Sequence, residues 1–254
     1  MKIVRFQDRA DEINYGLHQE DDTVALLHGN PYANIEVGPI VGNIQDIDLC
    51  SPVTPSKIIA VGLNYKLHAE EVGMALPEFP MFFYKPPTSV IGPKETIILP
   101  ETSDHVEHEC ELAVVMGERC SKVSVDTALK YIFGYTCGND ISARDWQKRE
   151  TQWVRGKGFD TFLPLGPCIQ TNLDPTQVQL STRVNGEVKQ SSSTSDLIFP
   201  VDQLISELSA IMTLLPGDII VTGTPSGVGP IHHGDLVEVE VEGIGTLQNP
   251  VASA

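Results

Sequence analysis

Short segments in which apolar and polar residues alternate recur along most of the chain, and this period of two is typical of half-buried strands. Because the strands do not alternate regularly with helices, the pattern favours an α+β fold over a doubly wound parallel sheet. Asn185-Gly186, between two alternating segments, predicts a two-residue β-hairpin, since both turn positions need a positive φ. The predicted strands of the main body are 58–61, 81–84, 96–99, 109–116, 132–136, 178–184, 186–189, 218–221 and 236–241.

Helices are fewer, and we predict three of them, near 125–132, near 143–150 and over 201–212. The third has apolar residues at the helical spacing from Val201 to Ile211. Ser142 and Asp145 have the spacing of a capping box, which predicts the start of the second helix.

The first fifty residues form a region of their own in the predicted organisation. Three alternating segments, 2–6, 15–18 and 23–28, are separated by turn-forming residues and predict a small antiparallel unit. The prolines in 51–55 hold the residues before them extended, which predicts a linker. We therefore divide the chain into a small N-terminal β unit, 1–52, and a main domain, 53–254.

Two acidic residues lie in an otherwise apolar predicted strand. Glu109 and Glu111 face the same side, roughly 6–7 Å apart along the backbone. Their face continues with apolar residues and the opposite face is apolar as well, so the strand is buried and unpaired charges in it would be costly. The acids of 237–242, by contrast, alternate with valines as in a half-exposed strand. The strand alone leaves two interpretations open, a metal site and a solvated edge.

A third carboxylate, Asp140, lies where a predicted strand turns into a helix. Ligation by oxygen alone favours a hard cation, Mg²⁺ or Mn²⁺, over zinc, and three monodentate carboxylates leave positions open for a bidentate ligand and a water. The alternative role for Asp140 is a helix cap.

Composition limits the partners. The chain of 254 residues has 17 basic and 34 acidic residues, a net charge of −17, which argues against nucleic acids and anionic membranes. No signal peptide and no apolar stretch of about 20 residues is present. The five cysteines are widely spaced and form no zinc motif, which favours free thiols in a reducing cytoplasm.

Several polar residues outside the acidic cluster are candidates for chemistry, each with a simpler alternative. His68 and Glu71 are three residues apart, so on a short helix the carboxylate would fix the tautomer of the imidazole; an exposed polar turn is the alternative. Lys157 has a glycine on each side, which allows close approach to a ligand but is also typical of a surface loop.

Arg144 and Gln147 share a face of the predicted helix after Asp140. The alternatives are that Arg144 pairs with Asp145 or a neighbouring acid and that Gln147 is simply solvated. Thr224, in a Gly-Thr-Pro turn, could donate its hydroxyl to a substrate carboxylate or belong to a plain turn. The glycines that follow lack the Rossmann spacing, so a dinucleotide site is excluded.

Taken together and in order, these segments resemble the fumarylacetoacetate hydrolase family, above all its short acylpyruvase and oxaloacetate decarboxylase members. The resemblance spans roughly 57–248 and departs at Gly158, where relatives often have serine. It rests on Ala60-Val61-Gly62-Leu63-Asn64-Tyr65 with His68 and Glu71; Phe83-Tyr84-Lys85-Pro86; His108-Glu109-Cys110-Glu111-Leu112; Gly138-Asn139-Asp140 with Ala143-Arg144-Asp145 and Gln147; Gly156-Lys157-Gly158-Phe159-Asp160; Val184-Asn185-Gly186; and Thr222-Gly223-Thr224-Pro225-Ser226-Gly227-Val228-Gly229.

The resemblance implies a mixed β-roll or β-sandwich core, a homodimer, and a lid around His68 that orders when substrate binds. It implies that Mg²⁺ or Mn²⁺ is held by Glu109, Glu111 and Asp140. It also implies a catalytic set of His68, Glu71, Lys157 and Gln147, and a substrate-binding set of Arg144, Thr224 and Tyr84.

The expected substrate is a small anionic 2-oxo acid. With the divalent ion, Lys157 and Arg144 would bring the site to about +1 within a protein of −17, as an anion requires. The leading hypothesis is cleavage of the C–C bond next to the 2-oxo acid, by acylpyruvate hydrolysis or oxaloacetate decarboxylation. The alternatives are a keto–enol tautomerase or dienoate isomerase, and a non-catalytic acidic cation-binding protein.

Overall fold

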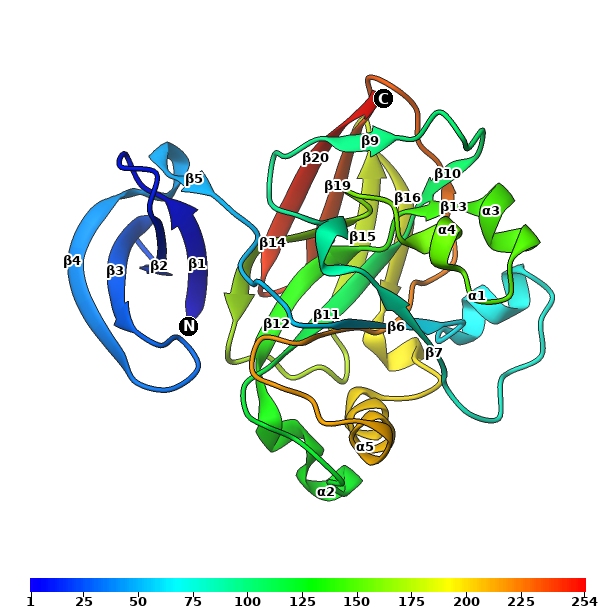
Figure 1. The fold of residues 1–254 in the computed structure, drawn as a ribbon, viewed down its shortest axis with the longest axis horizontal. Coiled ribbons are helices and arrows are strands. Elements are labelled where there is room, and N and C mark those ends of the chain that lie inside the picture. Colours follow the sequence, from blue (N-terminus) through cyan, green and yellow to red (C-terminus); the bar gives the residue numbers. More distant parts are fainter.

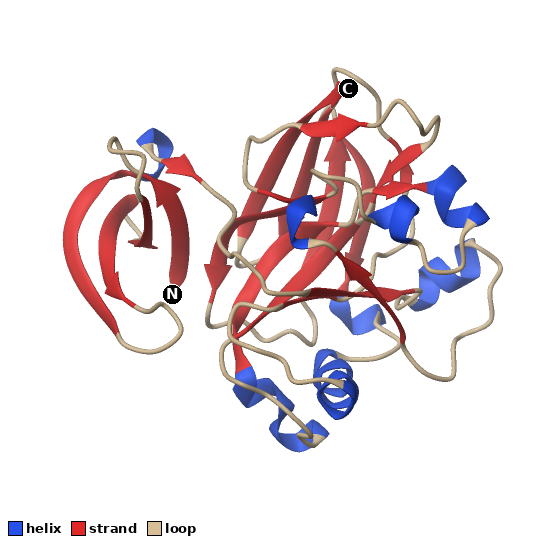
Figure 2. Ribbon diagram, viewed as in Figure 1, coloured by secondary structure: helices blue, strands red, loops and turns tan.

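Strands carry most of the regular structure in the computed structural model, which describes residues 1–254 (Figure 2). The five helices are α1 (Lys66–Glu71), α2 (Val125–Ala128), α3 (Arg144–Arg149), α4 (Val154–Lys157) and α5 (Val201–Ile211). None of them combines the length and apolar character needed to cross a membrane. The strands are β1 (Lys2–Gln7), β2 (Ile13–His18), β3 (Thr23–Gly29), β4 (Ile35–Asn43), β5 (Asp48–Leu49), β6 (Ile58–Gly62), β7 (Met81–Lys85), β8 (Val90–Ile91), β9 (Ile97–Leu99), β10 (Val106–His108), β11 (Cys110–Met116), β12 (Ile132–Asn139), β13 (Ser142–Ala143), β14 (Leu163–Gln170), β15 (Gln179–Val184), β16 (Glu187–Ser193), β17 (Ile219–Val221), β18 (Gly229–Pro230), β19 (Leu236–Val241) and β20 (Gly245–Ser253).

Three sheets build the molecule. The largest runs in the order β4-β3-β2-β1-β14-β12-β11-β17-β6-β7, with β5 paired to β1 and β8 to β14. A five-stranded sheet has the order β16-β15-β19-β20-β9, and a small one the order β13-β10-β18. The N-terminal strands lie to one side of the main body, and β1 joins it by pairing with β14 (Figure 1). The structure confirms the predicted α+β class.

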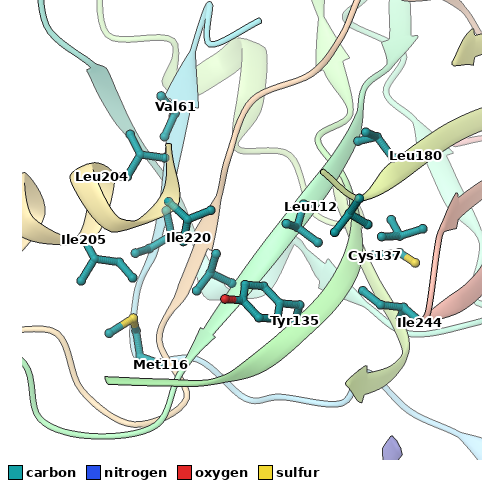
Figure 3. Packing of buried hydrophobic residues seen from close by; sticks show 14 of the residues in the cluster. Val61, Leu112, Met116, Tyr135, Cys137, Leu180, Leu204, Ile205, Ile220 and Ile244 are labelled. Carbon is teal, nitrogen blue, oxygen red and sulfur yellow. The ribbon is translucent and has the colours of Figure 1, made fainter. Parts of the chain in front are cut away.

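The core lies on both faces of β11. Leu112 and Met116 belong to a cluster that also takes in α5 and the five-stranded sheet (Figure 3). Ala113 and Val115, on the other face, pack into a second cluster. This confirms that the strand with the acidic residues is buried on both sides. Because β11 is central and enclosed, its first residues are held rigidly against their neighbours.

Prolines and glycines hid several strands from the sequence pattern. β4, β14 and β20 each contain a proline, and β4 and β14 also contain an internal glycine, so none of the three was predicted. Proline is rare inside strands because it donates no hydrogen bond to the ladder. β16 extends beyond the predicted strand 186–189 to Ser193. The predicted strand 109–116 begins one residue late, at Cys110, because Glu109 lies at the break where β10 passes into β11 and the chain changes sheet.

The predicted hairpin at Asn185-Gly186 is confirmed, with φ values of 53° and 80°. The three predicted helices are also present, the first as α2 followed by a short 3-10 turn. Ile211, counted in the buried face of α5, is 67% exposed at the helix end. The predicted capping box is wrong: α3 starts after Ala143 with no side-chain cap, and the Ser142 hydroxyl donates instead to the Asp140 carbonyl.

A buried aspartate fastens the linker to the main sheet. Asp218 is fully buried and accepts hydrogen bonds from the Ser56 hydroxyl and from the backbone N–H groups of Lys57 and Leu215, and it also pairs with the Lys57 ammonium. Because these contacts come directly before β6 and β17, they set the parallel register of Ile58 opposite Ile219.

We expect Asp218→Ala to lower the free energy of unfolding by about 3 kcal/mol, because it leaves buried N–H groups without an acceptor. Chemical denaturation checks this. The control Asp48→Ala removes an exposed aspartate whose side chain makes no hydrogen bond or salt bridge and should change stability by less than about 0.5 kcal/mol. Equal effects of the two substitutions would contradict the assigned role.

Candidate metal centre and active site

The structure brings the three predicted carboxylates together. Glu109 lies at the break between β10 and β11, Glu111 on β11, and Asp140 directly after β12, which pairs with β11. One oxygen from each lies within 4.8 Å of the other two, and all three residues are buried. The Asp140 N–H donates to the Glu109 carbonyl at 2.9 Å, which fixes the two segments against each other. Asp140 is not a helix cap, because α3 begins at Arg144 with no side-chain cap.

Basic side chains balance two of these acids. The Lys157 ammonium lies 2.8 Å from Glu109 and 2.7 Å from Asp140, and Lys85 lies 2.6 Å from Asp140. Arg144 lies 2.6 Å from Glu109. Burial raises the pKa of Glu109, but Lys157 and Arg144 outweigh it and lower the pKa to about 2.

Glu111 differs because it forms no salt bridge. Its Oε2 accepts the Gly223 N–H at 2.6 Å. Burial, together with the charges of Asp140 and Glu109, holds the pKa of Glu111 well above its usual value. The cluster thus lacks positive charge beside Glu111, and its donors are all carboxylate oxygens. Both properties fit a hard divalent cation, with Glu109, Glu111 and Asp140 as its ligands.

Lys157 is buried, and its placement contradicts the surface-loop alternative. It ends α4, a helix that the sequence pattern did not predict. A Cβ atom at Gly156 would lie 2.9 Å from the Gln147 Cβ, so the glycine allows α4 to pack directly on α3. This contact carries the ammonium into the acidic cluster.

His68 and Glu71 form a hydrogen-bonded pair on α1. The His68 Nδ1 lies 2.8 Å from Glu71 Oε2, while Glu71 Oε1 accepts the Gly227 N–H at 2.9 Å. The carboxylate therefore keeps the proton on Nδ1 and leaves Nε2 free to accept one. Glu71 also fastens α1 to the loop after β17.

A cavity of about 450 Å³ joins the two groups. The residues that line it include His68, Thr224, Glu109, Lys157, Arg144 and Gln147. Much of the remaining wall is apolar, including Phe83 and Trp153, which pack edge to face. A mostly apolar wall with a few convergent polar groups is typical of a site for a small ligand.

Arg144 is fixed by acceptors on several sides. It donates to Glu107 at 2.6 Å and to Gln147 Oε1 at 2.8 Å, in addition to its contact with Glu109. The alternative pairing of Arg144 with Asp145 is wrong, since Asp145 accepts instead from Ser103, but Arg144 does pair with two other acids, Glu107 and Glu109. Gln147 is not simply solvated, because it accepts from Arg144. The charges of Lys85 and Glu107, which the charge estimate omitted, cancel, and Lys148, which also lines the cavity, adds further positive charge.

Tyr84 lies outside this site. Its side chain is exposed, and its hydroxyl lies 3.2 Å from the Met212 sulfur. Successive residues of β7 face opposite sides, so Phe83 and Lys85 face the site and Tyr84 faces away. Lys85, which contacts Asp140, was not predicted as a site residue and appeared only within the Phe83-Tyr84-Lys85-Pro86 segment. The signal that could have identified it is a lysine in alternation with Phe83 and Met81 on a buried strand.

Comparison with known proteins agrees with this fold. Residues 57–252 match the family model described as fumarylacetoacetate (FAA) hydrolase C-terminal. A protein of Archaeoglobus fulgidus is 57% identical over 198 residues, covering 78% of this chain and 79% of that protein. The mitochondrial oxaloacetate tautomerase Fahd2a of Rattus norvegicus is 42% identical over 225 residues, covering 84% of this chain and 72% of that protein.

The crystal structure of a 5-carboxymethyl-2-hydroxymuconate delta-isomerase from Mycobacterium smegmatis has a TM-score of 0.91 and 45% identity, and the match covers 100% of both chains. The fold and the site therefore define an α+β enzyme with a buried acidic cluster that could hold a metal. This chain belongs to the fumarylacetoacetate hydrolase family.

Proposed function

We propose that this protein is a divalent-metal-dependent enzyme that interconverts the keto and enol forms of a short 2-oxo acid. The observation that carries the proposal is that a histidine with a free Nε2 and Glu109, a member of the buried carboxylate cluster, line the same cavity. The names of the rat tautomerase and the mycobacterial isomerase support proton transfer as the reaction. The proposed metal is Mg²⁺ or Mn²⁺.

The cavity suits an anionic substrate. Arg144 and Lys157 line it but are already paired with carboxylates, whereas Lys148 also lines it and forms no salt bridge. Lys148 is therefore available to a substrate carboxylate, and the apolar wall limits the length of the chain that fits.

The proton transfer follows from the position of His68. A bound divalent ion would polarise the 2-oxo oxygen and so acidify the hydrogens on the neighbouring carbon. His68 Nε2 removes one of these hydrogens as a proton while Glu71 holds the imidazole from Nδ1. The 2-oxo oxygen takes up a proton in exchange, the bond between the two carbons becomes the C=C bond of the enol, and no carbon–carbon bond breaks.

Cleavage of the C–C bond is a second candidate, and one observation favours it. The Glu71 side chain is 39% exposed, so the His68–Glu71 pair is within reach of water. Water activated by His68 could attack a distal carbonyl, as in acylpyruvate hydrolysis, and loss of a β-carboxylate would give decarboxylation of oxaloacetate. Both require the same carboxylate cluster.

Oxaloacetate distinguishes these reactions. With Mg²⁺ or Mn²⁺, we expect the protein to accelerate the equilibration of the enol absorbance at least about 100-fold over the same metal alone, without stoichiometric pyruvate or carbon dioxide. The metal-only control is essential because free ions decarboxylate oxaloacetate. Stoichiometric pyruvate would establish cleavage instead. Failure to act on either oxaloacetate or an acylpyruvate would contradict the proposal and favour a non-catalytic cation-binding protein.

A further inference from the structure

Gln190 is a buried amide at the point where the three sheets meet. It lies on β16 of the five-stranded sheet, and its Oε1 accepts hydrogen bonds from β10 and β11 on both sides of Glu109. The donors are the Cys110 N–H at 2.9 Å and His108 Nδ1 at 3.1 Å, and the Thr182 hydroxyl adds a third at 3.0 Å. The amide is thus anchored beside a proposed metal ligand.

The other end of the amide faces the loop after β17. Its Nε2 donates to Thr224 Oγ1 at 2.8 Å and to the Pro225 carbonyl at 2.8 Å. The amide cannot be turned over, because the Cys110 N–H can only donate and the Pro225 carbonyl can only accept. A reversed amide would oppose like groups at both positions. The orientation of Gln190 is therefore fixed by its backbone partners.

This orientation determines what the Thr224 hydroxyl can do. Since the amide nitrogen donates to Oγ1, that oxygen is the acceptor and its own proton is free for another partner. No protein acceptor takes this proton, and Thr224 lines the cavity. We propose that Gln190 is a positioning residue that directs the Thr224 hydroxyl proton into the cavity, toward a carboxylate oxygen of the substrate.

The backbone beside Gln190 supports the same loop. Gly227 has φ +92°, and a Cβ atom there would lie 2.1 Å from the Lys189 carbonyl, so the loop packs directly on β16. The Gly227 N–H in turn holds Glu71, the partner of His68. β16 thus supports the loop that carries the substrate-facing hydroxyl and that holds the pair that moves the proton. The inference rests on the proposed function in that the cavity takes a small anionic 2-oxo acid.

A double-mutant cycle tests this role, with oxalate, a mimic of a 2-oxo acid enolate, as the probe. Binding of oxalate to the Mn²⁺-loaded protein is measured for wild type, Gln190→Glu, Thr224→Val and the double variant. A carboxylate at position 190 accepts the threonine proton instead of donating to Oγ1. We expect each single variant to weaken oxalate binding about 10- to 100-fold, and the double variant to be no weaker than either by more than about 2-fold.

Mn²⁺ affinity, measured separately, should change less than about 3-fold in Thr224→Val and in Gln190→Glu. With an active enzyme, the same variants should raise KM and leave kcat within about 3-fold. Gln190→Met, which removes the amide at similar length, enters the same cycle in case the glutamate variant does not fold. Multiplicative losses in the cycle, or unchanged oxalate binding in the position-190 variants, would overturn the proposal. Intact coupling without turnover of any 2-oxo acid would overturn the proposed function alone.

Discussion

Replacing Glu111 with glutamine is expected to abolish tight binding of Mn²⁺ and Mg²⁺. We expect affinity to fall at least about 100-fold and turnover about 1,000-fold or more. Glu109 and Asp140 already have Lys157 as a counter-charge, whereas Glu111 is buried with no basic partner. A divalent ion is therefore the group that would compensate its charge, and an amide at this position removes the strongest reason for an ion to bind.

The same substitution should stabilise the metal-free protein. A neutral amide costs less to bury than an unpaired carboxylate, and its oxygen can still accept the Gly223 N–H. A gain of ~1–2 kcal/mol would raise Tm by roughly 4 °C for a chain of this size. Added Mn²⁺ should then raise the Tm of wild type and leave the Tm of Glu111→Gln unchanged.

Thermal unfolding with and without Mn²⁺ measures both effects, and calorimetric titration measures the affinity. Glu118→Gln is a matched control, because Glu118 is exposed and its side chain makes no hydrogen bond or salt bridge. The control should bind Mn²⁺ as wild type does. Wild-type affinity in Glu111→Gln would show that the three carboxylates do not hold the metal.

The sequence pattern predicted those parts of the fold that depend on local alternation. The two apolar faces of 112–116 were predicted because successive residues of a strand face opposite sides, and both alternating sets are apolar here. β14 could not be found in this way, since Pro164, Gly166 and Pro167 resemble a turn. Its strand state depends on pairing with β1 and β12, which are distant in sequence.

The site shows the same division. The sequence placed Glu109 and Glu111 on one strand face and Asp140 after another strand, but the metal site they form together was implied by the family resemblance. The structure brings the three carboxylates together. The basic partners were harder to predict, because Lys85 contacts Asp140 across 55 residues of sequence. On β7, Lys85 faces the site and the adjacent Tyr84 does not, so an error of one residue selects the wrong side chain. Gln190 gave no local signal, because its role depends on contacts with three other segments.

His68→Asn is expected to lower kcat by about 100- to 10,000-fold while Mn²⁺ affinity stays within about 3-fold of wild type. The asparagine amide can still reach Glu71 as Nδ1 does, but it lacks the Nε2 that accepts the proton. His68 lies on α1, outside the carboxylate cluster, so metal binding should not depend on it. The substitution therefore separates proton transfer from metal binding, which Glu111→Gln does not.

Steady-state kinetics on oxaloacetate and Mn²⁺ titration of the same samples measure the two quantities. Glu71→Gln should have a smaller effect on kcat, about 10- to 100-fold, because it weakens the hold on the imidazole but keeps Nε2. Tyr84→Phe is the control, since its hydroxyl contacts Met212 outside the cavity, and its kcat should equal that of wild type. If His68→Asn retained wild-type kcat, His68 would not be the proton acceptor, and another group lining the cavity would have to take that role. The proposed metal binding by the carboxylate cluster would be unaffected by this result.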